Sequence, residues 1–147
     1  MSRLIPATSY IILAMREKWM NLILDGKKTA EVRRTRPARP CDMPDYFYLY
    51  HKGHIHGIVK VAAWQTPECS GLTPYEWWGR ACTWYHDDAC LTRKEMLSYL
   101  CDAASPVVYF LGKAARFEKP IPVPCRPQSW QYATPELLDI INGKELK

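Results

Sequence analysis

The chain has 147 residues, of which 48% are hydrophobic, 12% aromatic and 24% charged, with a net charge of +5. This composition excludes a disordered chain, and the length allows a sizeable core without disulfides, so we expect one domain over residues 1–147. No apolar run approaches the roughly 18 residues of a transmembrane helix, and no signal-peptide pattern opens the sequence. We therefore expect a cytoplasmic location and no membrane partner.

The first half of the chain alternates between strand and helix patterns. Hydrophobic periodicity and turn residues predict a strand at 10–15, a helix at 16–25, a strand at 29–35, a proline-containing loop at 36–44, and strands at 46–51 and 58–64. Gly26 is placed to end the first helix, because glycine adopts the left-handed conformation that terminates many helices. Gly53 indicates a turn that joins the last two strands into a hairpin.

The second half adds helices, a strand and a proline-rich segment. The patterns predict a helix beginning at Thr73, a helix at 94–101, a strand at 107–117, an extended segment at 120–127 and a helix at 134–141. Thr73 with Glu76, and Thr92 with Glu95, have the spacing of capping boxes at helix starts. We expect Thr134 to cap the last helix and Gly143 to lie near its end.

Two features of this half bear on packing. Met96, Leu97 and Leu100 occur at helical spacing and are predicted to be core residues. Prolines recur through residues 120–127, and because proline has no backbone N–H, we expect them to interrupt strand pairing there. About five or six strands, several of them antiparallel, together with interspersed helices, predict an α+β fold built on a small mixed or antiparallel β-barrel with flanking helices.

The cysteines and histidines do not form a convincing metal site. None of the six cysteines forms a C-x-x-C pair, so we expect reduced thiols. Cys82, His86 and Cys90 would share a face if residues 81–90 were helical, but consecutive helical steps rarely converge on one ion. His51, His54 and His56 surround Gly53 and are interpreted as a solvated turn. We predict no metal and no cofactor.

The segment 26–34 has the pattern of a site. If its strand is extended, alternation places Ala30 and Val32 toward a core, with Arg34 on the same face, and Glu31 and Arg33 on the opposite face. A lysine, Lys28, stands at the start of the strand, where it can converge on that charged face. Such a cluster suits a polar, anionic ligand.

Basic residues are concentrated around this segment. These basic residues are Lys27, Lys28, Arg33, Arg34, Arg36 and Arg39, and the one acid near them is Glu31. A local basic field supplies salt-sensitive phosphate contacts, and the abundant aromatic residues could provide stacking surfaces, so we expect a nucleic-acid partner. The candidate stacking residues are Trp77, Trp78, Trp84 and Trp130.

Two motifs resemble one known family. Gly26, Lys28, Glu31 and Arg33 match the G-x-K-x-x-E-x-R signature of ASCH domains, and residues 126–132 resemble the family's closing R-P-Q-S-W-x-Y. The resemblance implies a PUA-like fold and a cleft that binds RNA or a nucleoside-like ligand. The candidate binding residues are Gly26, Lys28, Glu31, Arg33, Arg34, Ser129, Trp130 and Tyr132.

The same resemblance leaves catalysis open. Some small bacterial members are amidohydrolases that remove the acetyl group of N4-acetylcytidine with a lysine, a threonine and a glutamate. Lys28 matches the lysine, but Glu31 stands where those enzymes have the threonine, and Asp87 or Asp88 would take the place of the family's glutamate. The candidate catalytic set is Lys28, Glu31 and Asp88, acting as an amidohydrolase or as a ribonuclease.

Overall fold

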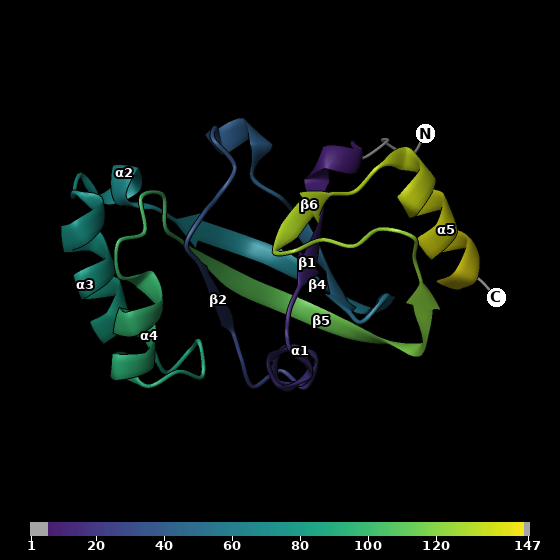
Figure 1. Ribbon diagram of the computed structural model, residues 1–147, viewed down its shortest axis with the longest axis horizontal. Coiled ribbons are helices and arrows are strands. Elements are labelled where there is room, and N and C mark those ends of the chain that lie inside the picture. The colour runs from purple at the N-terminus through teal and green to yellow at the C-terminus, as the bar shows by residue number, and fades with distance from the viewer. Residues whose placement is uncertain (1–5, 146–147) are drawn as a thin grey trace.

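A mixed sheet of six strands runs through the computed structural model, which describes residues 6–145 (Figure 1). The strands are β1 (Tyr10–Ala14), β2 (Ala30–Arg33), β3 (Tyr46–His51), β4 (His54–Gln65), β5 (Val107–Pro122) and β6 (Trp130–Tyr132). The α-helices are α1 (Glu17–Leu24), α2 (Pro67–Ser70), α3 (Pro74–Tyr85), α4 (Arg93–Leu100) and α5 (Pro135–Glu145). Two single 3-10 turns, η1 (Ala7–Ser9) and η2 (Pro40–Asp42), complete these elements.

The sheet has the order β2-β5-β4-β3-β1-β6 and curls toward a half-barrel. β1 and β3 are parallel, and the other neighbouring pairs are antiparallel. Side chains of the edge strand β6 contact the segment that follows β2: the indole of Trp130 donates to the hydroxyl of Thr35 at 3.4 Å, and the phenol of Tyr132 donates to the carbonyl of Asp42 at 2.6 Å. The predicted α+β fold with a small barrel-like sheet and flanking helices is confirmed.

The helices cover the curled sheet in three places. α1 packs with residues of β1, β3, β4 and β5 in one core, α3 and α4 pack on β2 and β5 in a second, and α5 packs on β1, β3 and β5 in a third. Figure 1 shows α2, α3 and α4 gathered at one end of the sheet and α5 at the other. Within residues 6–145, no helix combines the length and apolar content needed to cross a membrane.

The hairpin of β3 and β4 differs in one respect from its prediction. β3 has the predicted bounds, but β4 begins at His54 and not at residue 58, because pairing continues to a two-residue turn. Both turn residues are left-handed, with φ of 46° for Lys52 and 82° for Gly53. Two positive φ values match the twist of tightly connected antiparallel strands.

The expectation that prolines stop strand pairing is wrong at the end of β5. Ile121 pairs with Ile55, and Pro122 pairs with His54. β2 pairs only with Val107 to Phe110, so the far end of β5 has β4 as its single neighbour. A proline is tolerated on such an edge because its missing N–H can face away from the partner.

Helix starts were predicted better than helix interiors. Thr92 and Glu95 form the reciprocal capping box, and the hydroxyl of Thr73 accepts the amide of Glu76. Leu97 is 41% exposed, so its assignment to the core is wrong, while Met96 and Leu100 are buried. The buried residues of this short helix lie four apart on one narrow face. The last helix, α5, was predicted to end at residue 141 and extends through Gly143 to Glu145.

The packing between β4, β5 and α1 leaves no room for a side chain at Gly57, and a substitution there tests it. A Cβ at Gly57 would lie 2.5 Å from the carbonyl oxygen of Ala115 and 2.6 Å from a methyl group of Leu24. Since a backbone carbonyl cannot move aside, we expect Gly57→Ala to destabilise the fold by about 1–3 kcal/mol in urea unfolding.

Gly79 is the matched control, because a Cβ there meets nothing within 4 Å and the residue lies inside α3. We expect Gly79→Ala to leave stability unchanged or to raise it by about 0.5–1 kcal/mol. Equal effects of the two substitutions would contradict the packing described here.

Candidate functional site

The turn after α1 sets the position of Lys28. Gly26 has a φ of 78°, its amide donates to the carbonyl of Ile23 at 3.0 Å, and the amide of Lys27 donates to that of Leu22 at 2.9 Å. These two bonds form a Schellman motif, so the predicted helix-ending glycine is confirmed. The amide of Lys28 also donates to the carbonyl of Leu22 at 2.9 Å, which brings the lysine directly beneath the helix.

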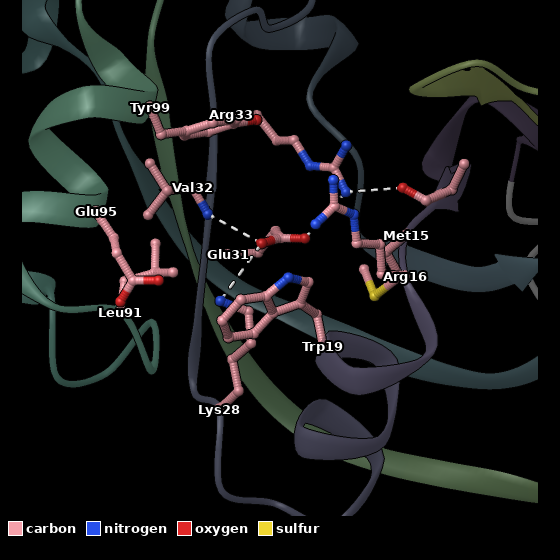
Figure 2. A pocket seen from close by; sticks show the side chains of 11 residues that line it. Met15, Arg16, Trp19, Lys28, Glu31, Val32, Arg33, Leu91, Glu95 and Tyr99 are labelled. Carbon is pink, nitrogen blue, oxygen red and sulfur yellow. Dashed lines mark hydrogen bonds and ion pairs between the residues drawn. The ribbon is translucent and has the colours of Figure 1, made fainter.

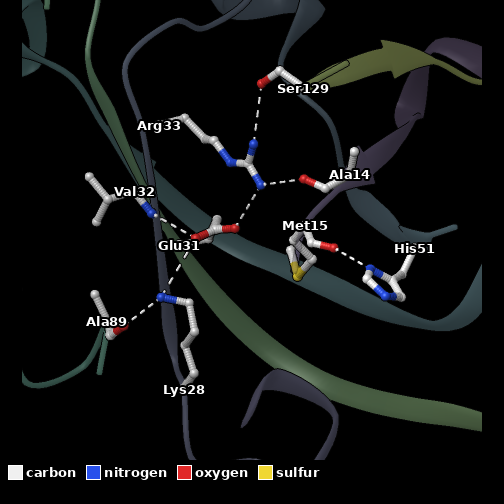
Figure 3. A network of polar contacts seen from close by, with 9 residues as sticks. All are labelled: Ala14, Met15, Lys28, Glu31, Val32, Arg33, His51, Ala89 and Ser129. Carbon is white, nitrogen blue, oxygen red and sulfur yellow. Dashed lines mark hydrogen bonds and ion pairs between the residues drawn. The ribbon is translucent and has the colours of Figure 1, made fainter. Parts of the chain in front are cut away.

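β2 divides its side chains as alternation requires. Ala30 and Val32 pack in the core with α3 and α4. Glu31 and Arg33 point to the opposite side, toward Lys28 (Figure 3). Arg34, the next residue, is exposed, and its guanidinium donates to the carbonyl of Tyr99 at 3.0 Å.

Lys28, Glu31 and Arg33 form a largely buried network (Figure 3). One carboxylate oxygen of Glu31 lies 3.6 Å from the ammonium of Lys28, and the other accepts from Nη2 of Arg33 at 3.1 Å. Only 3% of Lys28 and 7% of Glu31 are exposed. Buried charges are tolerated when they are paired and hydrogen-bonded, and this group combines two cations with one anion.

Both cations also bind backbone carbonyls of other segments. The ammonium of Lys28 donates to the carbonyl of Ala89 at 2.5 Å, and Nη2 of Arg33 donates to that of Ala14 at 3.0 Å. Nη1 of Arg33 donates to the hydroxyl of Ser129 at 3.2 Å. The network therefore joins β2 to β1, to the loop before α4 and to the closing motif of the chain.

A cavity of about 390 Å³ opens beside this network (Figure 2). Its volume is within the range of sites that hold small molecules. Elements from both halves of the chain contribute its lining: Ala14, Met15, Arg16, Trp19, Lys28, Glu31, Val32, Arg33, Leu91, Glu95 and Tyr99. The cavity is thus part apolar and part charged.

An indole and a phenol are among the walls of the cavity. The ring centroid of Trp19 lies 5.3 Å from the ammonium of Lys28, within the range of a cation–π contact. Tyr99 is 40% exposed, and partial desolvation raises the pKa of its phenol, which can donate a hydrogen bond. The backbone amide of Thr92 lowers the pKa of Glu95.

The sequence did not single out Trp19 or Tyr99. Its candidate stacking residues lie elsewhere: Trp77 is buried in the core with α4, Trp84 is 57% exposed on α3, and Trp130 lies at the junction of the sheet edges. The signal for Trp19 was its place in the first turn of the helix that precedes the motif. Tyr99 is far from the motif in sequence and gave no such signal.

Of the predicted site residues, the structure brings Lys28, Glu31 and Arg33 together at the cavity, and Ser129 contacts Arg33. Gly26 contributes the left-handed turn before Lys28, while Trp130 and Tyr132 connect β6 to the segment that follows β2. None of Gly26, Ser129, Trp130 and Tyr132 lines the cavity.

Asp87 and Asp88 do not line the cavity either. Both are exposed, and the backbone carbonyl of Asp88 accepts the amides of Thr29 and Ala30 at 2.8 and 3.0 Å. These bonds fix the loop whose next residue, Ala89, binds Lys28. The role of Asp88 in this geometry is therefore to hold the loop through its main chain.

The cysteine and histidine pattern does not form a helical face. α3 ends at Tyr85, and Cys90 is left-handed with a φ of 57°. Over residues 6–145, no group of three or more His, Cys, Asp or Glu side chains is close enough to hold a metal ion.

Comparison with solved structures shows which fold this is. The chain is similar to three crystal structures of the ASCH protein of Zymomonas mobilis, each with a TM-score of 0.72. The structure of one variant has 17% sequence identity, and the match covers 95% of this chain and 99% of that chain. The unsubstituted protein has 16% identity, with 92% of this chain and 95% of that chain covered. A second variant has 16% identity, with 92% of this chain and 97% of that chain covered. At this identity the likeness shows the fold alone.

The fold is that of a PUA-like protein, a class of RNA-binding-type domains. The sequence model described as ASCH domain matches residues 13–120, and the chain belongs to the ASCH family. The predicted membership of this family is thus confirmed. A comparison with curated proteins finds no match.

Loss of the buried carboxylate of Glu31 is expected to destabilise the fold far more than loss of an exposed one. Glu31→Gln removes the anion that compensates Lys28 and Arg33, and we expect it to lower the free energy of unfolding by about 3–5 kcal/mol. Urea unfolding followed by circular dichroism measures this loss.

Asp25→Asn is the control, because the ion pair between Asp25 and Arg116 is exposed on both sides. Exposed pairs contribute about 0–1 kcal/mol, so we expect little change. A loss at Glu31 no larger than that at Asp25 would show that the network does not depend on its carboxylate.

Proposed function

We propose that the chain acts as a single domain and that its cavity binds one nucleoside, modified or unmodified, either free or as an unstacked residue of single-stranded RNA. The observation that carries this proposal is the place of the Trp19 ring beside the buried Lys28, Glu31 and Arg33. Sequence-specific recognition of RNA commonly takes an unstacked base, stacks it on an aromatic ring and hydrogen-bonds its edges.

The charged groups of the cavity complement a base edge. A carboxylate such as Glu31 accepts a hydrogen bond from an exocyclic amine, and an ammonium such as Lys28 donates to a carbonyl oxygen of a base. The Tyr99 phenol adds a further donor at the wall. A cavity of about 390 Å³ suits one nucleoside and excludes a duplex.

Three arginines of the basic field expected from the sequence already have partners within the chain. Arg36 pairs with Glu68 at 2.6 Å, Arg39 pairs with Asp42 at 3.2 Å, and Arg34 donates to a backbone carbonyl. Guanidinium groups held in this way are less available for phosphates. This favours recognition inside the cavity over a broad phosphate-binding surface.

Hydrolysis of an acylated nucleoside is the second candidate, because Lys28 and Glu31 stand side by side at a cavity wall. Two observations favour binding instead. Asp88 does not line the cavity, and the two carboxylate oxygens of Glu31 already accept hydrogen bonds, one from the amide of Val32 and one from Arg33. A carboxylate engaged in this way serves recognition better than proton transfer.

Trp19 provides the direct test of binding. We expect Trp19→Leu to weaken binding of the four ribonucleosides and of a mixed-sequence single-stranded RNA by roughly 5- to 100-fold, because stacking on an aromatic ring contributes about 1–3 kcal/mol per base. Isothermal titration for nucleosides and fluorescence anisotropy for labelled RNA measure the change.

Trp84→Leu is the matched control, since Trp84 is exposed on α3 and does not line the cavity. Its affinities should equal those of the wild type. Equal losses in the two variants, or none in Trp19→Leu, would refute a base-binding cavity at this place.

Catalysis is tested by incubating the protein with N4-acetylcytidine and with RNA and analysing the products by mass spectrometry. We expect both to remain intact. Conversion by the wild type that disappears in Lys28→Ala would instead make the cavity a hydrolase site with Lys28 at its centre.

A further inference from the structure

A second cavity, of about 370 Å³, adjoins the first at the turn between β1 and α1. The two cavities share Ala14, Met15 and Arg16. The remaining lining of the second comes from the β3–β4 turn and from the closing motif: Tyr50, His51, Lys52 and Gln128. The two cavities therefore lie next to each other on the segment of Ala14, Met15 and Arg16.

Two hydrogen bonds to the main chain of Met15 hold the walls of the second cavity together. The amide of Met15 donates to the carbonyl of Tyr50 at 3.1 Å, and Nδ1 of His51 lies 3.0 Å from the carbonyl of Met15 (Figure 3). Because a carbonyl oxygen only accepts, Nδ1 carries the proton in this bond. The hairpin turn is thus tied to the β1–α1 turn from both sides of Met15.

Lys52 occupies a strained position at the tip of this hairpin. Its φ of 46° is left-handed, a conformation in which glycine and asparagine are common and lysine is not. The paired strands on either side fix the turn and therefore the direction in which the lysine leaves it.

The second cavity has cations that are not engaged elsewhere. Within residues 6–145, the side chains of Arg16 and Lys52 have neither an ion pair nor a hydrogen bond, in contrast to Arg34, Arg36 and Arg39. Gln128 adds an amide that can donate. No aspartate or glutamate is among the lining residues, and Glu17, which follows Arg16, is exposed outside the lining.

We propose that this second cavity, formed by Arg16, His51, Lys52 and Gln128, binds the phosphate attached to the nucleoside in the first cavity. The proposal rests on the proposed function and deepens it: the ligand is a nucleotide and not a bare nucleoside. Phosphate oxygens accept hydrogen bonds from cations and amides, and the lining offers two unpaired cations and one side-chain amide. No carboxylate in the lining would repel the phosphate. The phosphate belongs either to a free nucleoside monophosphate or to an RNA strand.

Calorimetry of the four ribonucleosides and of their 5′- and 3′-monophosphates at low salt tests the proposal. We expect the best monophosphate to bind about tenfold more tightly than its nucleoside, as a charge-assisted hydrogen bond requires. Lys52→Asn should remove this gain and leave nucleoside affinity unchanged, and asparagine tolerates the left-handed backbone at this position.

Lys113→Gln is the control, because Lys113 is exposed on β5 and lines neither cavity. It should keep the phosphate gain. An RNA oligomer that binds more tightly than the monophosphate assigns the phosphate to a strand, and the reverse assigns it to a free nucleotide; either result supports the subsite.

The two proposals fail in different ways. Equal affinity for nucleoside and monophosphates in the wild type would overturn the phosphate subsite and leave the base cavity standing. If neither binds, the base cavity fails, and titration with inorganic phosphate decides on the subsite alone. Shifts of the His51 and Gly53 amide NMR signals that vanish in Lys52→Asn would support it, and their absence would overturn it.

Discussion

The arrangement of the site depends on one carboxylate between two cations. Glu31 compensates Lys28 and Arg33 in a place where little water reaches either charge. Because each cation also binds a carbonyl from a distant segment, at Ala89 or Ala14, the carboxylate indirectly fixes the loop before α4 and the end of β1. The same ion pairs therefore compensate the buried charges and hold the segments that shape the cavity.

Arg33 also explains how an open sheet is held in a barrel-like curl. The outer strands β2 and β6 have no backbone ladder between them, so side chains make the connection. Arg33 reaches Ser129, Trp130 reaches Thr35, and Tyr132 reaches the carbonyl of Asp42. Side-chain links leave room for a cavity where a further pair of strands would fill it.

The sequence predicted what short-range physics determines. The left-handed Gly26, the alternation of Glu31 and Arg33, and the capping box at Thr92 follow from residues within a few positions. It could not predict which distant groups neutralise a charge: Arg36 is engaged by Glu68. Nor could it predict that Tyr99, from a helix of the second half, would face the motif across a cavity. Those contacts depend on how the curled sheet and the helices pack.

Residues that line the first cavity stand at both ends of helix α1. Arg16 stands at its start, Trp19 lies in its first turn, and the Schellman turn after it is followed by Lys28. Because this one eight-residue helix and the turns at its ends position all three residues, a change in the position of α1 would move all three. The linings of the two cavities therefore depend on the position of the same helix.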